Sequence, residues 1–136
     1  MSYLIDTNVI SELTKNKPNK KVVDWFKGTP DHELHISVIT LGEIRKGVIR
    51  INDDKKKEKI RSWLDHELVD WFRDRILPID AQVANKWGVL QASLDRTLPA
   101  IDSLIAATAM HSDLILVTRN TKDFAITGME VINPFV

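Results

Sequence analysis

The chain has 136 residues, of which 19 are Lys or Arg, 19 are Asp or Glu and none is Cys, and its formal net charge is zero. This composition is typical of one globular domain, residues 1–136, which can bury a core without disulfides or a zinc site built from cysteines. A neutral chain is poorly suited to holding nucleic acid through charge alone, because that mode needs many unpaired cations.

The start of the chain and its apolar segments favour a cytoplasmic protein without a membrane span. Residues 1–5 run directly into Asp6 without the basic and apolar segments of a signal peptide. The longest apolar stretch, residues 98–110, contains Asp102, and it is shorter than the ~20 residues that a spanning helix needs. We therefore expect a protein that folds and acts in the cytoplasm.

Short apolar runs alternate with segments of helical periodicity along the chain. The runs of strand length are residues 3–5, 34–38, 76–79, 114–117 and 129–132. Strands that alternate with helices in this way form a parallel sheet that helices cover on both faces. The sequence therefore predicts an α/β fold in a single domain.

A basic segment lies in the middle of the chain. Residues 53–75 have the pattern of one long helix, with Trp63 and Trp71 near its apolar stripe. Residues 45–61 carry eight basic side chains against three acidic ones. This segment is either a solvated helix face or a strip that contacts nucleic-acid phosphates through residues such as Arg45 and Arg50.

Acidic side chains occupy the places where an open α/β sheet binds ligands, beyond the carboxyl ends of the strands. They are Asp6 after the first strand, Glu43 in the helix after the second, Asp102 in the first turn of an apolar helix over 101–110, and Asp123 after the fourth. Asp6 also suits a helix N-cap, Asp102 a helix dipole and Asp123 the surface. Glu43 is harder to explain structurally, because a carboxylate among apolar residues needs a positive partner.

Several carboxylates at one edge of a sheet repel one another and raise each other's pKa unless a cation compensates. With oxygen ligands and no Cys, the fitting cations are Mg²⁺ and Mn²⁺ rather than zinc. Such an ion can bind a phosphate oxygen, activate water and neutralise the charge that develops in an in-line displacement. The acids therefore predict phosphodiester hydrolysis. His35 lies inside the second apolar run, so we expect it to be a strand residue.

Four segments in fixed order carry a recognisable pattern: Leu4-Ile5-Asp6-Thr7-Asn8, then Thr40-Leu41-Gly42-Glu43-Ile44, then Asp102 within a helix of small residues, then Thr118-Arg119-Asn120-Thr121-Lys122-Asp123-Phe124. Together they resemble the PIN-domain ribonucleases along the whole chain. Within that family the chain is most similar to the VapC toxins of bacterial toxin–antitoxin modules, including the FitB-like branch.

The resemblance implies a three-layer α/β/α PIN-like domain with a central parallel sheet, usually dimeric, that cuts RNA with Mg²⁺ or Mn²⁺. By position, Asp6, Glu43 and Asp102 match the three acids that typify the family. Many relatives have Asp where this chain has Asn120, so Asp123 is the candidate for the fourth carboxylate. Asn120 is then a neutral ligand or a residue that holds water.

The resemblance also implies further roles and a protein partner. Thr7 and Thr118 would orient ligands or the scissile phosphate through their hydroxyls. An antitoxin would form a hetero-oligomer with the chain and place a basic side chain among the acids, where it replaces the cation. The set Trp25, Phe26, Trp63 and Trp71 is a candidate for the apolar groove that receives it, with core packing as the alternative.

Two other functions compete with the nuclease. One is a PIN-like module that binds nucleic acid without catalysis; the presence of all three principal acids argues against it. The other is a phosphoacceptor domain of the receiver kind. That fold needs a second acid in the first loop, where this chain has Thr7 and Asn8, and a Lys before the last Pro, where it has Asn133.

Overall fold

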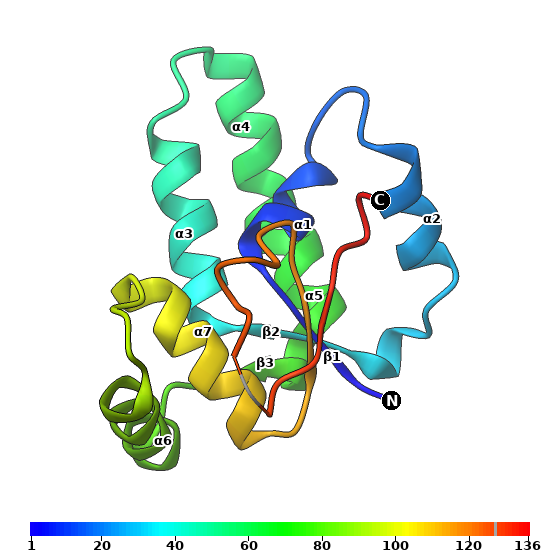
Figure 1. Cartoon of the computed structure of the whole chain (residues 1–136). Helices are drawn as coiled ribbons and strands as arrows, with labels where there is room; N and C mark the ends of the chain where they lie inside the picture. The colour runs from blue at the N-terminus through cyan, green and yellow to red at the C-terminus, as the bar shows by residue number, and fades with distance from the viewer. Residues whose placement is uncertain (127) are drawn as a thin grey trace.

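The computed structural model describes residues 1–126 and 128–136 of the chain. Its elements in chain order are β1 (Tyr3–Ile5), α1 (Thr7–Glu12), α2 (Lys20–Lys27), a 3-10 turn (Asp31–Glu33), β2 (Leu34–Ser37), α3 (Val38–Ile49), α4 (Asp54–Ser62), a π-helical segment (Trp63–Leu68), α5 (Val69–Phe72), a second 3-10 turn (Arg73–Arg75), β3 (Ile76–Leu77), α6 (Ala81–Ser93), α7 (Ala100–His111), β4 (Ile115–Val117) and β5 (Val131–Ile132) (Figure 1).

The five strands form one sheet in the order β3-β2-β1-β4-β5, and every neighbouring pair is parallel. Each of the five predicted runs contributes a strand, and four of the strands are shorter than the runs. β2 ends at Ser37 because the Ser37 hydroxyl accepts the N–H of Ile39 and so begins α3. His35 lies within β2 as predicted, and its buried Nδ1 has no hydrogen-bond partner among the described residues.

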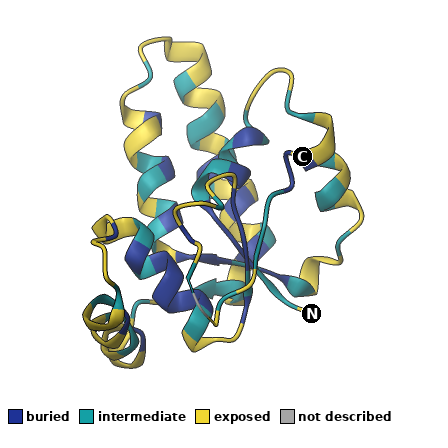
Figure 2. Cartoon of the chain, viewed as in Figure 1, coloured by how far each residue is buried: buried dark blue, intermediate teal, exposed yellow. Residues whose placement is uncertain are grey.

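Helices cover both faces of the sheet, which confirms the three-layer α/β/α architecture. Neighbouring residues of a strand point to opposite faces, so Ile5 packs with residues of α1, α2, α3 and α5, whereas Leu4 packs with residues of α6 and α7. Figure 2 shows the buried residues on the strands and on the inner sides of the helices, with the exposed residues on the outer sides. Among the described residues, no helix is long and apolar enough to cross a membrane.

The helix predicted over 53–75 is a continuous helical path that changes its geometry three times. It runs as α4, widens into the π-helical segment, returns to an α-helix in α5 and tightens into a 3-10 turn at Arg73. Arg73 has a φ of 37°, a left-handed conformation that ends the path before β3. α3 and α4 lie side by side as a hairpin at one end of the molecule (Figure 1).

The aromatic residues proposed for a groove pack mainly into the core. Trp25 lies edge-on to Phe26 with ring centroids 5.3 Å apart, and Phe26 lies 5.7 Å from Trp71. These three residues pack against the core between the sheet and helices α1, α2 and α5. Trp25, Phe26 and Trp71 are therefore packing residues of the core, whereas Trp63 also lines a surface pocket.

Candidate active site

Asp6 is the most buried acid at the carboxyl edge of the sheet, with 5% of its surface exposed. It caps α1: its Oδ1 accepts the N–H of Thr7 at 2.8 Å. Its Oδ2 accepts the hydroxyl of Thr118, which follows β4, also at 2.8 Å. Burial raises the pKa of Asp6, the hydrogen bonds from Thr118 and Thr7 oppose this rise, and the nearby Asp102 and Glu43 add to it. Capping explains one oxygen only, so Asp6 is more than a helix cap.

Glu43 lies beside Asp6 because a short chain of hydroxyls fixes it there. It is half-buried in the second turn of α3, and its Oε1 accepts the hydroxyl of Thr7 at 2.7 Å. The hydroxyl oxygens of Thr7 and Thr40 are 3.2 Å apart, and Thr40 is fully buried. Since a hydroxyl has one proton, Thr7 donates to Glu43 and accepts from Thr40. Thr40 was not among the predicted site residues, although its place one turn before Glu43 was a usable signal.

Asp102 stands in the first turn of α7, as predicted, and is half-buried. Burial raises the pKa of Asp102, and the charges of Asp123 and Glu43 raise it further. The next residue, Ser103, accepts the indole N–H of Trp87 at 2.8 Å, which ties α7 to α6. The acid that follows β1 and the acids on α3 and α7 therefore act on one another electrostatically at the carboxyl edge.

The residues Thr118 to Asp123 form a tight loop after β4. The fully buried Thr118 hydroxyl accepts the N–H of Asn120 at 3.1 Å, and the carbonyl of Asn120 accepts the N–H of Asp123, also at 3.1 Å. Arg96 donates to the carbonyl of Asp123 at 2.8 Å, and Phe124 anchors the loop in the core. The Asn120 and Asp123 side chains are exposed.

The four acids supply the hard oxygen donors that Mg²⁺ and Mn²⁺ prefer. Within the described ranges, no three His, Asp or Glu side chains are already gathered into a metal cage. The raised pKa values of Asp6 and Asp102 show that their ionised forms are held at a cost. A divalent ion would remove this cost, so the donor set fits a cation that draws the side chains together.

Two arginines of the basic segment 45–61 form ion pairs within the protein. Arg45 forms an ion pair with Asp65 and thereby lowers the pKa of that carboxyl. Arg61 also binds Asp65, with 3.0 Å between Nη1 and Oδ2, and it pairs with Glu58. This arrangement favours the solvated-face interpretation for Arg45 and Arg61. Arg50 is exposed at the C-terminal end of α3.

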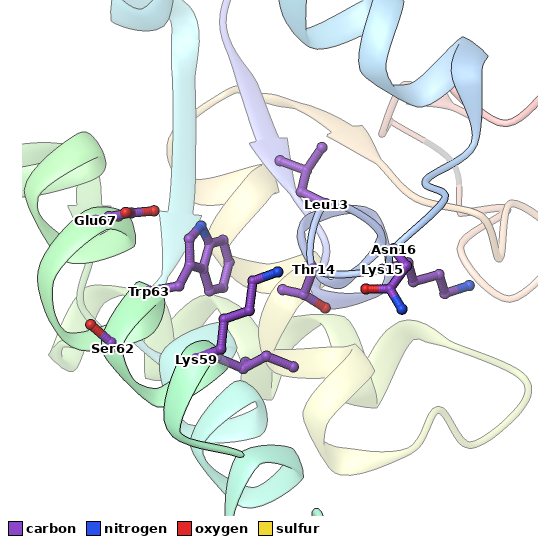
Figure 3. Close-up of a pocket in the computed structure, with 9 residues that line it drawn as sticks. Leu13, Thr14, Lys15, Asn16, Lys59, Ser62, Trp63 and Glu67 are labelled. Atoms are coloured by element: carbon purple, nitrogen blue, oxygen red, sulfur yellow. The ribbon is translucent and has the colours of Figure 1, made fainter. Parts of the chain in front are cut away.

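A pocket of about 420 Å³ lies between the end of α1 and the α4 path. Figure 3 shows Trp63 and Lys59 on one wall pointing toward Thr14 on the other. Its remaining lining residues are Leu13, Lys15, Asn16, Ile60, Ser62 and Glu67. The lining combines apolar side chains with charged groups of both signs, a mixture that suits a partner segment with apolar and charged side chains.

Comparison with known proteins places this site in a family. The PIN domain matches residues 3–128. Toxin FitB of Neisseria gonorrhoeae is 35% identical over 135 residues, covering 97% of each chain. The VapC ribonuclease Y4jK of Sinorhizobium fredii is 31% identical over 135 residues, covering 97% of this chain and 96% of that protein.

Solved structures agree with this match. The crystal structure of FitAcB from Neisseria gonorrhoeae superposes with a TM-score of 0.90 at 34% identity and covers 98% of both chains. A structure of FitAB bound to an IR36 DNA fragment also has a TM-score of 0.90, at 33% identity, and covers 98% of this chain and 96% of that chain. The chain described here belongs to the PIN-domain family.

Proposed function

We propose that this protein is a metal-dependent endoribonuclease that acts as the toxin of a toxin–antitoxin module. The observation that carries the proposal is the environment of Asp6. This acid is buried and held by hydrogen bonds, and burial together with the nearby Asp102 and Glu43 raises its pKa. Burying such a charge among like charges is costly unless a cation is to bind there. The names of the relatives, a toxin and a VapC ribonuclease, support the same activity.

Asp6, Glu43 and Asp102 would hold the ion, and Asp123 would be the fourth carboxylate. A bound Mg²⁺ or Mn²⁺ would supply Lewis acidity at the phosphate and an activated water. Thr118 keeps Asp6 oriented and favours its ionised form, because its hydroxyl donates to Oδ2. The ionised carboxylate is the form that binds a metal.

The two threonines are positioning residues for the acids. The hydroxyl of Thr7 donates to Glu43, and the hydroxyl of Thr118 donates to Asp6. Because both hydroxyl protons already form hydrogen bonds to carboxylates, other groups must contact the scissile phosphate. The candidates for RNA contacts are the exposed Asn120 and Arg50, which caps the C-terminal end of the helix that carries Glu43.

We further propose that the chain binds a cognate antitoxin and forms homodimers within a toxin–antitoxin hetero-oligomer. The superposed FitAcB and FitAB structures support an assembly of this kind. The pocket at the end of α1 supplies the apolar ring of Trp63 and the cationic group of Lys59 for the antitoxin segment, whereas Lys15 is paired with Glu12 at 2.8 Å. A basic antitoxin side chain that reaches the acids would take the place of the cation.

A catalytically inert nucleic-acid module is the second candidate function. The observation in its favour is that the acids in the described part of the chain are not already gathered into a cage. The inert module predicts no metal binding by the intact protein, and titration calorimetry with Mn²⁺ tests this directly.

The deciding experiment is cleavage of a structured RNA mixture by the purified, antitoxin-free protein with Mg²⁺ or Mn²⁺. Cleavage should disappear when EDTA is added and in the variant Asp6→Asn. Circular dichroism checks that this variant is folded. The matched control is Asp24→Asn, because Asp24 is an exposed acid on α2, and this variant should cut like the wild type. Absence of both cleavage and metal binding in the wild type would overturn the nuclease in favour of the inert module.

A further inference from the structure

Asn8 joins the two loops that carry acids at the carboxyl edge. Its side-chain Nδ2 donates to Asp6 Oδ2 at 3.4 Å and to Thr118 Oγ1 at 3.3 Å. Its Oδ1 accepts the backbone N–H of Arg119 at 3.1 Å, across 111 positions of sequence. One half-buried side chain on α1 therefore contacts both the residue that follows β1 and the residues that follow β4.

The backbone at Arg119 is held from both sides, so the loop 119–123 has a defined starting point. Besides the bond from its N–H to Asn8, its carbonyl accepts Asn133 Nδ2 at 3.4 Å. Its guanidinium lies over the ring of Phe135, 4.0 Å from the centroid. From this point the chain turns through Asn120, whose carbonyl accepts the N–H of Asp123 at 3.1 Å.

We propose that Asn8 is a positioning residue of the nuclease site, which fixes the loop 119–123 against Asp6 and so sets the place of Asp123 among the acids. The inference rests on the proposed function and adds a residue to its machinery. Thr7 serves Glu43, and Asn8, the next residue of α1, serves Asp6 and the loop.

The chemistry of the amide explains why Asn occupies this position. Two donor hydrogens and an acceptor oxygen are needed for these three contacts, and a carboxylate or a hydroxyl lacks this combination. Asn is also a weaker helix former than Ala. At the second position of α1, the three side-chain contacts therefore favour Asn, whereas helix propensity does not.

The test compares Asn8→Ala with Asn85→Ala, a matched control at an exposed position of α6. In the metal-free protein, the amides of residues 119–123 should exchange with solvent roughly tenfold faster in Asn8→Ala, the factor expected for one lost hydrogen bond. Mn²⁺ affinity by calorimetry and kcat for RNA cleavage should each fall about 10–100-fold, as for other residues that orient metal ligands. KM for RNA should stay within about twofold, because the loss concerns the reacting centre rather than uniform binding.

A second pair of variants separates the route of the effect. Asn8→Asp keeps an oxygen for the N–H of Arg119, so it should preserve slow exchange of the loop, and it remains informative if Asn8→Ala does not fold. In an Asp123→Asn background, Asn8→Ala should lower kcat much less than in the wild type, because the residue to be positioned has lost its charge.

The outcomes distinguish this inference from the proposed function. If the wild type binds Mn²⁺ and cuts RNA while Asn8→Ala matches it in exchange and kcat, only the role of Asn8 is refuted. An undiminished effect of Asn8→Ala in the Asp123→Asn background also refutes positioning of Asp123. A wild type that neither binds Mn²⁺ nor cuts RNA overturns both.

Discussion

Replacing Thr118 by Val removes the hydroxyl that supports Asp6 with almost no change of shape. The Thr118 hydroxyl donates to Asp6 Oδ2 at 2.8 Å and is fully buried, so solvent cannot replace it. A hydrogen bond to a charged group contributes about 1.5–3 kcal/mol. The same oxygen accepts Nδ2 of Asn8 and the N–H of Asn120, and losing an acceptor costs further free energy. We expect Thr118→Val to lower the free energy of unfolding by about 2–4 kcal/mol at pH 7.

This destabilisation should depend on pH with a defined sign. Burial already raises the pKa of Asp6, and the hydrogen bond from Thr118 limits the rise, so the variant should raise it further. The bond stabilises the ionised carboxylate. The difference between wild type and variant should therefore be largest above the folded-state pKa of Asp6 and should shrink as the pH falls through it.

The assay is urea unfolding in EDTA at several pH values from neutral to mildly acidic. Thr108→Val is the matched control, because the Thr108 hydroxyl is also fully buried but donates to the neutral carbonyl of Leu104 at 2.8 Å. Thr108→Val should lower the free energy of unfolding by less than Thr118→Val, and by the same amount at every pH. A Thr118→Val cost that equals the control, or that stays constant with pH, would refute the argument that the hydroxyl stabilises a buried charge.

Four further variants test the remaining assignments. Asp102→Asn should abolish cleavage yet raise the free energy of unfolding in EDTA at pH 7 by about 0.5 kcal/mol, after discounting for partial exposure, because burial and neighbouring acids raise the pKa of Asp102. Thermal melts should show this gain in stability vanish as the pH falls through that pKa, and a variant less stable than the wild type would refute the repulsion. Asp123→Asn should lose only part of the cleavage rate, and full activity in RNA gels would return it to the surface. Arg50→Glu should weaken RNA binding and flatten its salt dependence in filter binding, whereas an unchanged slope would remove it from the RNA path. Trp63→Ala should weaken antitoxin binding by roughly 1–3 kcal/mol in calorimetry, and wild-type affinity would exclude the pocket from that interface.

The layers of the fold could be predicted because hydrophobic periodicity is a local property. The apolar runs around residues 3–5 and 114–117 each became a parallel strand. Acids placed just after such runs, like Asp6, then share one edge, because parallel strands all end on the same side. The nature of the site followed from residue type and place alone.

The contacts that organise the site could not be predicted, because they join residues distant in sequence. Asp6 and Thr118 are 112 positions apart, and only the register of β1 with β4 brings them together. Arg45 was considered for RNA contact, but the α3–α4 hairpin places it on Asp65, 20 positions later. Pairing of this kind depends on how two helices cross, which composition does not record.

The electrostatics of the acids link metal binding to inhibition. Ionised Asp6 and Asp102 are costly in the metal-free protein because burial and their neighbours raise both pKa values. Any positive group that enters gains the attraction of the same carboxylates, whether it is a divalent ion or the guanidinium or ammonium of a partner chain. The two therefore exclude each other by charge as well as by volume. Each also stabilises the fold, and more so the tighter it binds, so a bound antitoxin can inhibit the site while it makes the protein more stable.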